Sequence, residues 1–167
     1  MSPNLPPDPP AGRPPAISPL PPGLRTLDDV LLQHARSRPQ ALAMRVEGRD
    51  VSYGKLARRT ARAAARLWHE WGVRPGDRVA WLGLNHPDQI TLLFALARIG
   101  ALLVPLNFRL ASAEWQAVLA DCTPRCVLHD AAWAQAAMAL AQAAGLPAHA
   151  IDTLIATVMP CAPAAPP

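Results

Sequence analysis

One continuous run, residues 72–110, constrains the fold more than any other part of this 167-residue chain: GVRPGDRVAWLGLNHPDQITLLFALARIGALLVPLNFRL. Its RPGD tetrapeptide predicts a tight turn, because proline presets φ and glycine accepts positive φ. An apolar strand is predicted at residues 79–82, followed by a helix capped by Asn85 or His86. A second buried strand is predicted at 101–105, just after Gly100. Two apolar strands joined by a helix predict a βαβ unit of a parallel sheet.

Further elements are predicted before this run. Thr26 and Asp29 have the spacing of a capping box, so a helix should begin there and end before Pro39. Residues 41–53 are typical of two short strands around a turn. Ser52 should cap a long helix that leads into the run.

After the run, the pattern continues with a helix that Ser112 opens and that ends at about residue 121, a strand at 125–128 and a helix at 131–144. Strands that alternate with helices predict an α/β fold, a mostly parallel sheet with flanking helices and right-handed crossovers.

The two ends of the chain differ from this pattern. Residues 1–23 hold half of the 20 prolines, so we expect a disordered extension that samples extended polyproline conformations. A ligand for a proline-reading domain is the less favoured interpretation. Residues 159–167 form a similar Pro/Ala-rich tail, which leaves residues 24–158 as the folded domain.

The bulk properties leave several partner classes open. The net charge is +4 at pH 7 and the pI is about 9.6, which permits nucleic acid, phosphate or acidic membrane surfaces as partners. Three cysteines and no secretory signal pattern predict a cytoplasmic protein. The longest apolar stretch, residues 90–106, is interrupted by Arg98, Gly100 and Pro105, so no transmembrane segment is expected.

Four blocks, in this order, carry a family resemblance: VSYGKLARRTARAAARL, then GVRPGDRVA, then LNHPDQITLLFALARIGALLVPLNFRL, then a helix containing Glu114 followed by CVLHD. Together they resemble the AMP-forming acyl-CoA synthetases, the acyl-adenylate-forming ligases of the AMP-binding enzyme family, over about residues 26–130. The resemblance implies that residues 24–158 are a truncated piece of the large N-terminal domain of such a ligase. It also implies ATP, Mg²⁺ and coenzyme A as cofactors of the full-length family, and a role in fatty acid metabolism.

The sequence lacks the parts that such chemistry requires. A glycine- and hydroxyl-rich loop ending in Pro-Lys-Gly should hold the triphosphate, and no such loop is present. The single lysine, Lys55, lies on an early helix and matches no catalytic position. We therefore carry over no catalytic, cofactor-binding or metal-binding residue, and expect no cofactor to be bound and no adenylation by this chain alone. The family positions that do match are scaffold: Gly76, Asp77, Asn85, Gly100, Pro105 and Asn107.

Two other functions stay open. The chain could be a non-catalytic α/β interaction module that pairs with a separately encoded remainder of the ligase, or self-associates through exposed apolar surface. It could also be a basic nucleic-acid-binding domain built on Arg58, Arg59, Arg62 and Arg66. That arginine row lacks interleaved aromatic residues, so we interpret it as a solvated helix face and expect no nucleic-acid partner.

Several residues could be interpreted as part of a metal-binding or active site, but each has a simpler structural interpretation. Cys122, Cys126 and His129 have zinc-like spacing, but Cys126 and His129 should point to opposite faces of a strand, which favours structural cysteines. His86 and Asp88, beside Asn85, are expected to cap a helix and not to form an active-site cluster. Without a motif around them, three histidines are expected to be ordinary surface or core residues: His34, His69 and His149. The five tryptophans are expected in the core: Trp68, Trp71, Trp81, Trp115 and Trp133.

Overall fold

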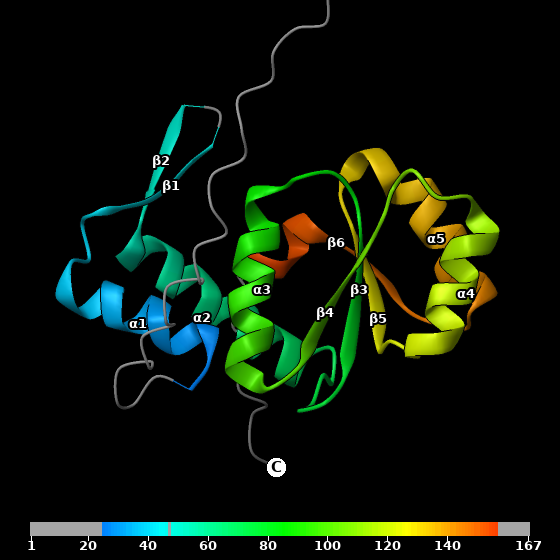
Figure 1. Cartoon of the computed structure of the whole chain (residues 1–167), viewed down its shortest axis with the longest axis horizontal. Helices are drawn as coiled ribbons and strands as arrows, with labels where there is room; N and C mark the ends of the chain where they lie inside the picture. The colour runs from blue at the N-terminus through cyan, green and yellow to red at the C-terminus, as the bar shows by residue number, and fades with distance from the viewer. Residues whose placement is uncertain (1–24, 47, 157–167) are drawn as a thin grey trace, which may run out of the picture.

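The computed structural model describes residues 25–46 and 48–156, so the predictions for residues 1–23 and 159–167 lie outside the described residues (Figure 1). In chain order the elements are α1 (Leu27–Ser37), β1 (Leu42–Val46), β2 (Arg49–Ser52), α2 (Tyr53–His69), β3 (Arg78–Leu82), α3 (Pro87–Ile99), β4 (Leu102–Leu106), α4 (Ser112–Cys122), β5 (Cys126–His129), the 3-10 helix η1 (Ala131–Trp133), α5 (Ala134–Ala143), β6 (Ala148–Ala150) and the 3-10 helix η2 (Ile151–Ile155).

Within the described residues, four strands form one sheet in the order β4-β3-β5-β6, and every neighbouring pair is parallel. In Figure 1, α2 and α3 lie on one side of this sheet and α4 and α5 on the other. Each side has its own apolar core: Trp81 and Leu128 face α2, α3 and η2, whereas Leu82 and Val127 face α4 and α5. The alternation along β3 and β5 therefore places side chains in both cores, and the predicted α/β fold with flanking helices is confirmed.

The local signals for turns and caps agree with the structure. Thr26 and Asp29 form the predicted capping box, and α1 ends before Pro39. His86 caps α3, and Gly100 ends it in the left-handed region with φ 73°. A third, smaller core cluster joins α1, the β1–β2 hairpin and the start of α2.

Three expectations need correction. β4 was predicted to be buried, but it is an edge strand whose Leu102 and Pro105 are exposed, because no described strand pairs with its outer side. The start of α4 at Ser112 is confirmed, and the amide of its N-cap, Ala111, donates to the Glu114 carboxylate at 2.7 Å. The helix predicted at 131–144 is divided into η1 and α5. Of the five tryptophans, Trp81 and Trp115 are buried, Trp71 and Trp133 are partly buried against the two cores, and Trp68 is partly exposed.

The sequence pattern did not predict β6 or η2. They follow α5 and complete the sheet beside β5. Ile151 and Leu154 of η2 are buried in the core on the α2 and α3 side. Among the described helices, none is both long and apolar enough to cross a bilayer.

Candidate functional site

The carboxyl ends of β3 and β4 border a hollow of about 500 Å³, which we call the carboxyl-edge hollow. Crevices at this edge of a parallel sheet are where open α/β folds bind ligands. Three of the expected scaffold positions meet here: Asn85, Pro105 and Asn107. The other lining residues are Trp81, Gly83, Leu84, Gln89, Leu106 and Phe108. Apolar walls with a few side-chain amides suit a small molecule with an apolar body, and the lining contains no ionisable side chain for acid–base chemistry.

Asn107 orders the loop that follows β4. Its side-chain Oδ1 accepts a hydrogen bond from the amide of Arg109 at 3.0 Å. Its backbone oxygen accepts one from Trp115 Nε1 at 2.8 Å, which connects the loop to the buried face of α4. Both hydrogen bonds of Asn107 therefore hold the loop after β4 in shape, which is the scaffold role that the sequence predicts for this residue.

Asp130 braces the same edge of the sheet, and the sequence interpretation missed it. Its buried carboxylate accepts hydrogen bonds from the amide of Leu84 at 2.7 Å and from the amide of Trp133 at 3.0 Å. The first bond connects the end of β3 to the turn after β5, and the second caps η1. Gly83 is required beside it, because a Cβ at that position would lie 2.6 Å from Asp130 Oδ2. The sequence signal that could have identified Asp130 is its place directly after a buried strand, at the carboxyl edge of the sheet.

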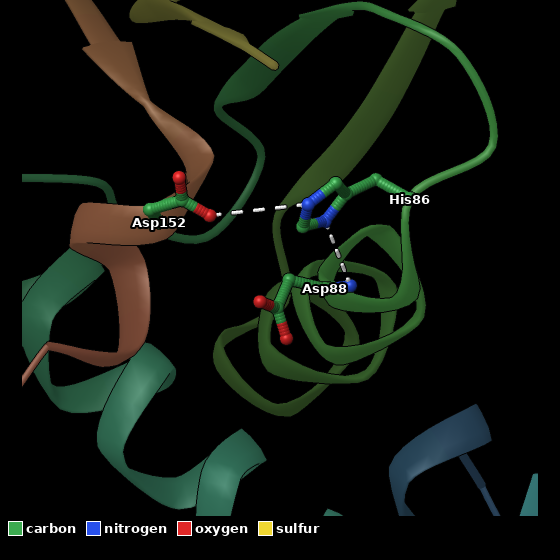
Figure 2. Close-up of side chains that lie close together, drawn as sticks. All are labelled: His86, Asp88 and Asp152. Atoms are coloured by element: carbon green, nitrogen blue, oxygen red, sulfur yellow. Dashed lines mark hydrogen bonds and ion pairs between the residues drawn. The ribbon is translucent and has the colours of Figure 1, made fainter. Parts of the chain in front are cut away.

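His86, Asp88 and Asp152 form the second polar cluster, at the start of α3 (Figure 2). His86 Nδ1 accepts a hydrogen bond from the amide of Asp88 at 3.1 Å, and its Nε2 lies 3.9 Å from Asp152 Oδ1 on η2. The Asp88 carboxylate is buried and forms an ion pair with Arg59 of α2. Sequence reasoning found His86 and Asp88 but not their partners, which are distant along the chain.

This cluster does not fit a metal ion well. One potential ligand atom from each of the three residues lies within 4.8 Å of the others, which is close enough to consider a cation. However, Asp88 is already neutralised by Arg59, whose guanidinium would repel a cation, and His86 Nδ1 is used by the helix cap. The geometry favours the predicted capping role, together with the Arg59–Asp88 ion pair that joins α2 and α3.

The arginine row on α2 differs from the predicted solvated face. Arg66 is buried and pairs with Glu70 at 3.0 Å, and Arg59 is held by Asp88. Arg59 meets a carboxylate of α3, and Arg66 pairs with the C-cap residue of its own helix four positions on, whereas Arg58 and Arg62 stay exposed.

Cys122, Cys126 and His129, all within the described residues, do not assemble into a metal site. Cys126 faces the core with Leu128, and burial raises the pKa of its thiol to about 12. His129 has the opposite parity on β5, and its Nδ1 lies 2.8 Å from the backbone oxygen of Asp130. Cys122 lies at the end of α4, where burial raises its pKa.

The remaining scaffold positions lie at the amino edge of the sheet. The amide of Gly76 donates to the oxygen of Gly100 at 2.8 Å, and the amide of Leu102 donates to the oxygen of Asp77 at 2.8 Å. Gly76 adopts φ 84°, which a glycine tolerates. These residues fix where β3 and β4 begin, and none of them lines the carboxyl-edge hollow.

Comparisons with known proteins agree with this arrangement. Residues 31–164 match the family described as AMP-binding enzyme. A feruloyl-CoA synthase from an Amycolatopsis species is 46% identical over 110 residues, which cover 66% of this chain and 22% of that protein. A solved structure described as a long-chain-fatty-acid CoA ligase from Rhodopseudomonas palustris is 30% identical, with a TM-score of 0.72, over 80% of this chain and 37% of that one.

An O-succinylbenzoate coenzyme A synthetase from Bacillus subtilis, solved with ATP and magnesium, superposes with a TM-score of 0.69 over 77% of this chain and 34% of that one. At 24% identity it is similar in fold alone. The chain spans about a fifth of the length of the feruloyl-CoA synthase that it matches.

Proposed function

This chain belongs to the AMP-binding enzyme family, and from that premise we propose that it supplies the N-terminal scaffold of an AMP-forming carboxylic acid–CoA ligase. In the reaction of that class, a carboxylate oxygen attacks the α-phosphorus of ATP and pyrophosphate leaves. The thiol of coenzyme A then displaces AMP from the acyl-adenylate. The observation that carries the proposal is the family match over residues 31–164, which coincides with the parallel sheet and its flanking helices.

The residues present do not fit ATP or Mg²⁺ at the carboxyl-edge hollow. Its lining offers amides and apolar walls, without a cation for a triphosphate or a carboxylate for a metal ion. The chain also contains no Ser/Thr/Gly-rich loop ending in Pro-Lys-Gly. We therefore assign these residues a positioning role only, and derive no catalytic step from them.

We expect these 167 residues alone not to form an acyl-adenylate. The test is exchange of labelled pyrophosphate into ATP by the purified chain, with a fatty or an aromatic acid as substrate. The expected signal equals that of a blank without acid. Acid-dependent exchange above that blank would contradict the proposal.

A second candidate is a non-catalytic module that pairs with a separately encoded remainder of the ligase. The exposed side of β4 favours it, since a further strand could pair there. Co-purification with a polypeptide that contains the missing phosphate loop would support this candidate.

A cytoplasmic location and a role in fatty acid metabolism remain predictions from the sequence.

A further inference from the structure

A second hollow, of about 220 Å³, lies between α2 and η2, and we call it the basic hollow. Its lining residues are Lys55, Arg58, Arg59, Arg62 and Ile155. Four of these five are cations, none is an acid, and none of them lines the carboxyl-edge hollow. We propose that the basic hollow binds a polyphosphate, a chain of two or three linked phosphate groups, through Lys55, Arg58 and Arg62. This proposal goes beyond the ligase scaffold role and does not depend on it.

The spacing of the cations places them on one face of α2. Lys55, Arg58 and Arg62 stand at positions i, i+3 and i+7, so their side chains project from successive turns of the helix. Like charges three or four residues apart on a helix destabilise it. A bound anion would remove this repulsion, so a ligand should stabilise the fold.

These three cations are available to a ligand. Among the described residues, none of them forms an ion pair. Arg59 differs, because its Nη2 is committed to the Asp88 carboxylate. The Nε of Arg59 is nevertheless buried and has no acceptor within the described part of the chain, which leaves one donor of the lining unsatisfied.

The size and chemistry of the hollow select the ligand class. A volume of 220 Å³ equals about seven water molecules at their liquid volume, which is room for more than one phosphate group. Guanidinium groups match phosphate oxygens through paired N–H donors. Nucleic acid fits less well, because the lining has no aromatic side chain on which a base could stack.

The test is calorimetric titration of the full chain with sodium tripolyphosphate at low salt. The variant Arg58→Gln/Arg62→Gln removes two charges from the basic hollow. The matched control, Arg36→Gln/Arg49→Gln, removes the same charge from exposed positions on α1 and β2. We expect at least about tenfold weaker binding by the hollow variant and less than about twofold change in the control. Equal weakening of both variants, or no saturable binding by the unmodified chain, would overturn the proposal.

Further measurements define the ligand and guard against misfolding. ATP should bind about as tightly as tripolyphosphate if linked phosphates carry the recognition. Binding of ATP alone, or of single-stranded DNA alone, would overturn the proposal in favour of base recognition. In the unmodified chain, tripolyphosphate should shift the amide resonances of residues 55–62 first. Arg58→Lys/Arg62→Lys keeps both charges but loses the paired guanidinium donors, so its affinity should lie between those of the unmodified chain and of Arg58→Gln/Arg62→Gln.

Discussion

Gly83 and Asp130 show how two residues distant in the sequence fix the carboxyl edge of the sheet. The Asp130 carboxylate lies so close to the backbone at Gly83 that no side chain fits there. It accepts the amide hydrogen bond of the next residue, Leu84. The end of β3 is thereby held beside the turn after β5, in the position that shapes the carboxyl-edge hollow.

We expect Gly83→Ala to destabilise the protein by roughly 1–3 kcal/mol, the usual cost of overpacking a close-packed position. The added Cβ would lie 2.6 Å from both Asp130 Oδ2 and Trp81 Cζ2. The measurement is the free energy of unfolding in urea. Leu84→Ala, at a half-exposed neighbouring side chain, is the control and should change stability by less than about 0.5 kcal/mol. Similar stabilities for the two variants would contradict this account.

His149 makes the stability depend on pH. Its ring stacks on Trp71 with centroids 4.1 Å apart, and burial, followed by the nearby charge of His129, lowers its pKa below the usual 6.5. Near that pH the unfolded chain therefore binds more protons than the folded one. This contribution to stability is present above about pH 6.5 and is lost as the pH falls towards the lowered pKa.

We expect the free energy of unfolding to fall less between pH 7.5 and pH 5.5 in His149→Gln than in the unmodified chain, because the variant lacks the group with the lowered pKa. Urea unfolding at the two pH values measures this difference. An identical pH dependence in both proteins would show that His149 does not contribute.

At the scale of secondary-structure elements, ion pairs decide how the helices are joined. Arg98 of α3 donates two hydrogen bonds, of 2.7 and 2.9 Å, to the buried carboxylate of Asp28 on α1. The Arg45–Asp50 pair of the β1–β2 hairpin has similar chemistry, but both of its side chains are more than half exposed. The Arg98–Asp28 pair, with its buried carboxylate, therefore helps to position α1 against α3. The exposed Arg45–Asp50 pair contributes little to the position of the hairpin.

We expect Asp28→Asn to cost about 1–3 kcal/mol of stability, because it leaves Arg98 without its counter-charge at a position that is about a quarter exposed. Asp50→Asn should cost less than about 1 kcal/mol, since exposed ion pairs contribute little. Denaturant unfolding of both variants tests the contrast. Equal losses would mean that burial does not set the strength of these pairs.

At the scale of the whole molecule, the exposed edge of the sheet is the feature that most favours self-association. Leu102 on β4 is 52% exposed, and the outer side of β4 pairs with no described strand. Leu84 and Ile90 are also exposed. An apolar, unpaired edge strand is a template for pairing with another chain, so the 167-residue chain should self-associate.

We expect Leu102→Lys to reduce this self-association, because a charge on an edge strand opposes pairing with a second copy. Light scattering across a range of protein concentrations measures the effect. Leu27→Lys is the matched control, since Leu27 is equally exposed but lies on α1, away from the edge. A monodisperse monomer at every concentration, with a sharp thermal transition, would contradict the prediction.

The sequence by itself determined the turns, the caps and the order of most elements. The Thr26–Asp29 capping box, the turn at Gly76 and the left-handed Gly100 depend on atoms within a few residues, so local patterns predict them. The run of residues 72–110 likewise determined a βαβ unit. Its second strand was predicted correctly in position but not in burial.

Only the tertiary structure decided which side chains have partners. Arg59 meets Asp88 across 29 residues, and Arg98 meets Asp28 across 70. The three-residue strand β6 is too short to show a periodicity of its own, and it forms because β5 offers it an edge. Burial and pairing depend on residues that come together only on folding, whereas caps and turns depend on neighbours along the chain. For this reason the sequence indicated the scaffold, and the fold determined its hollows and its ion pairs.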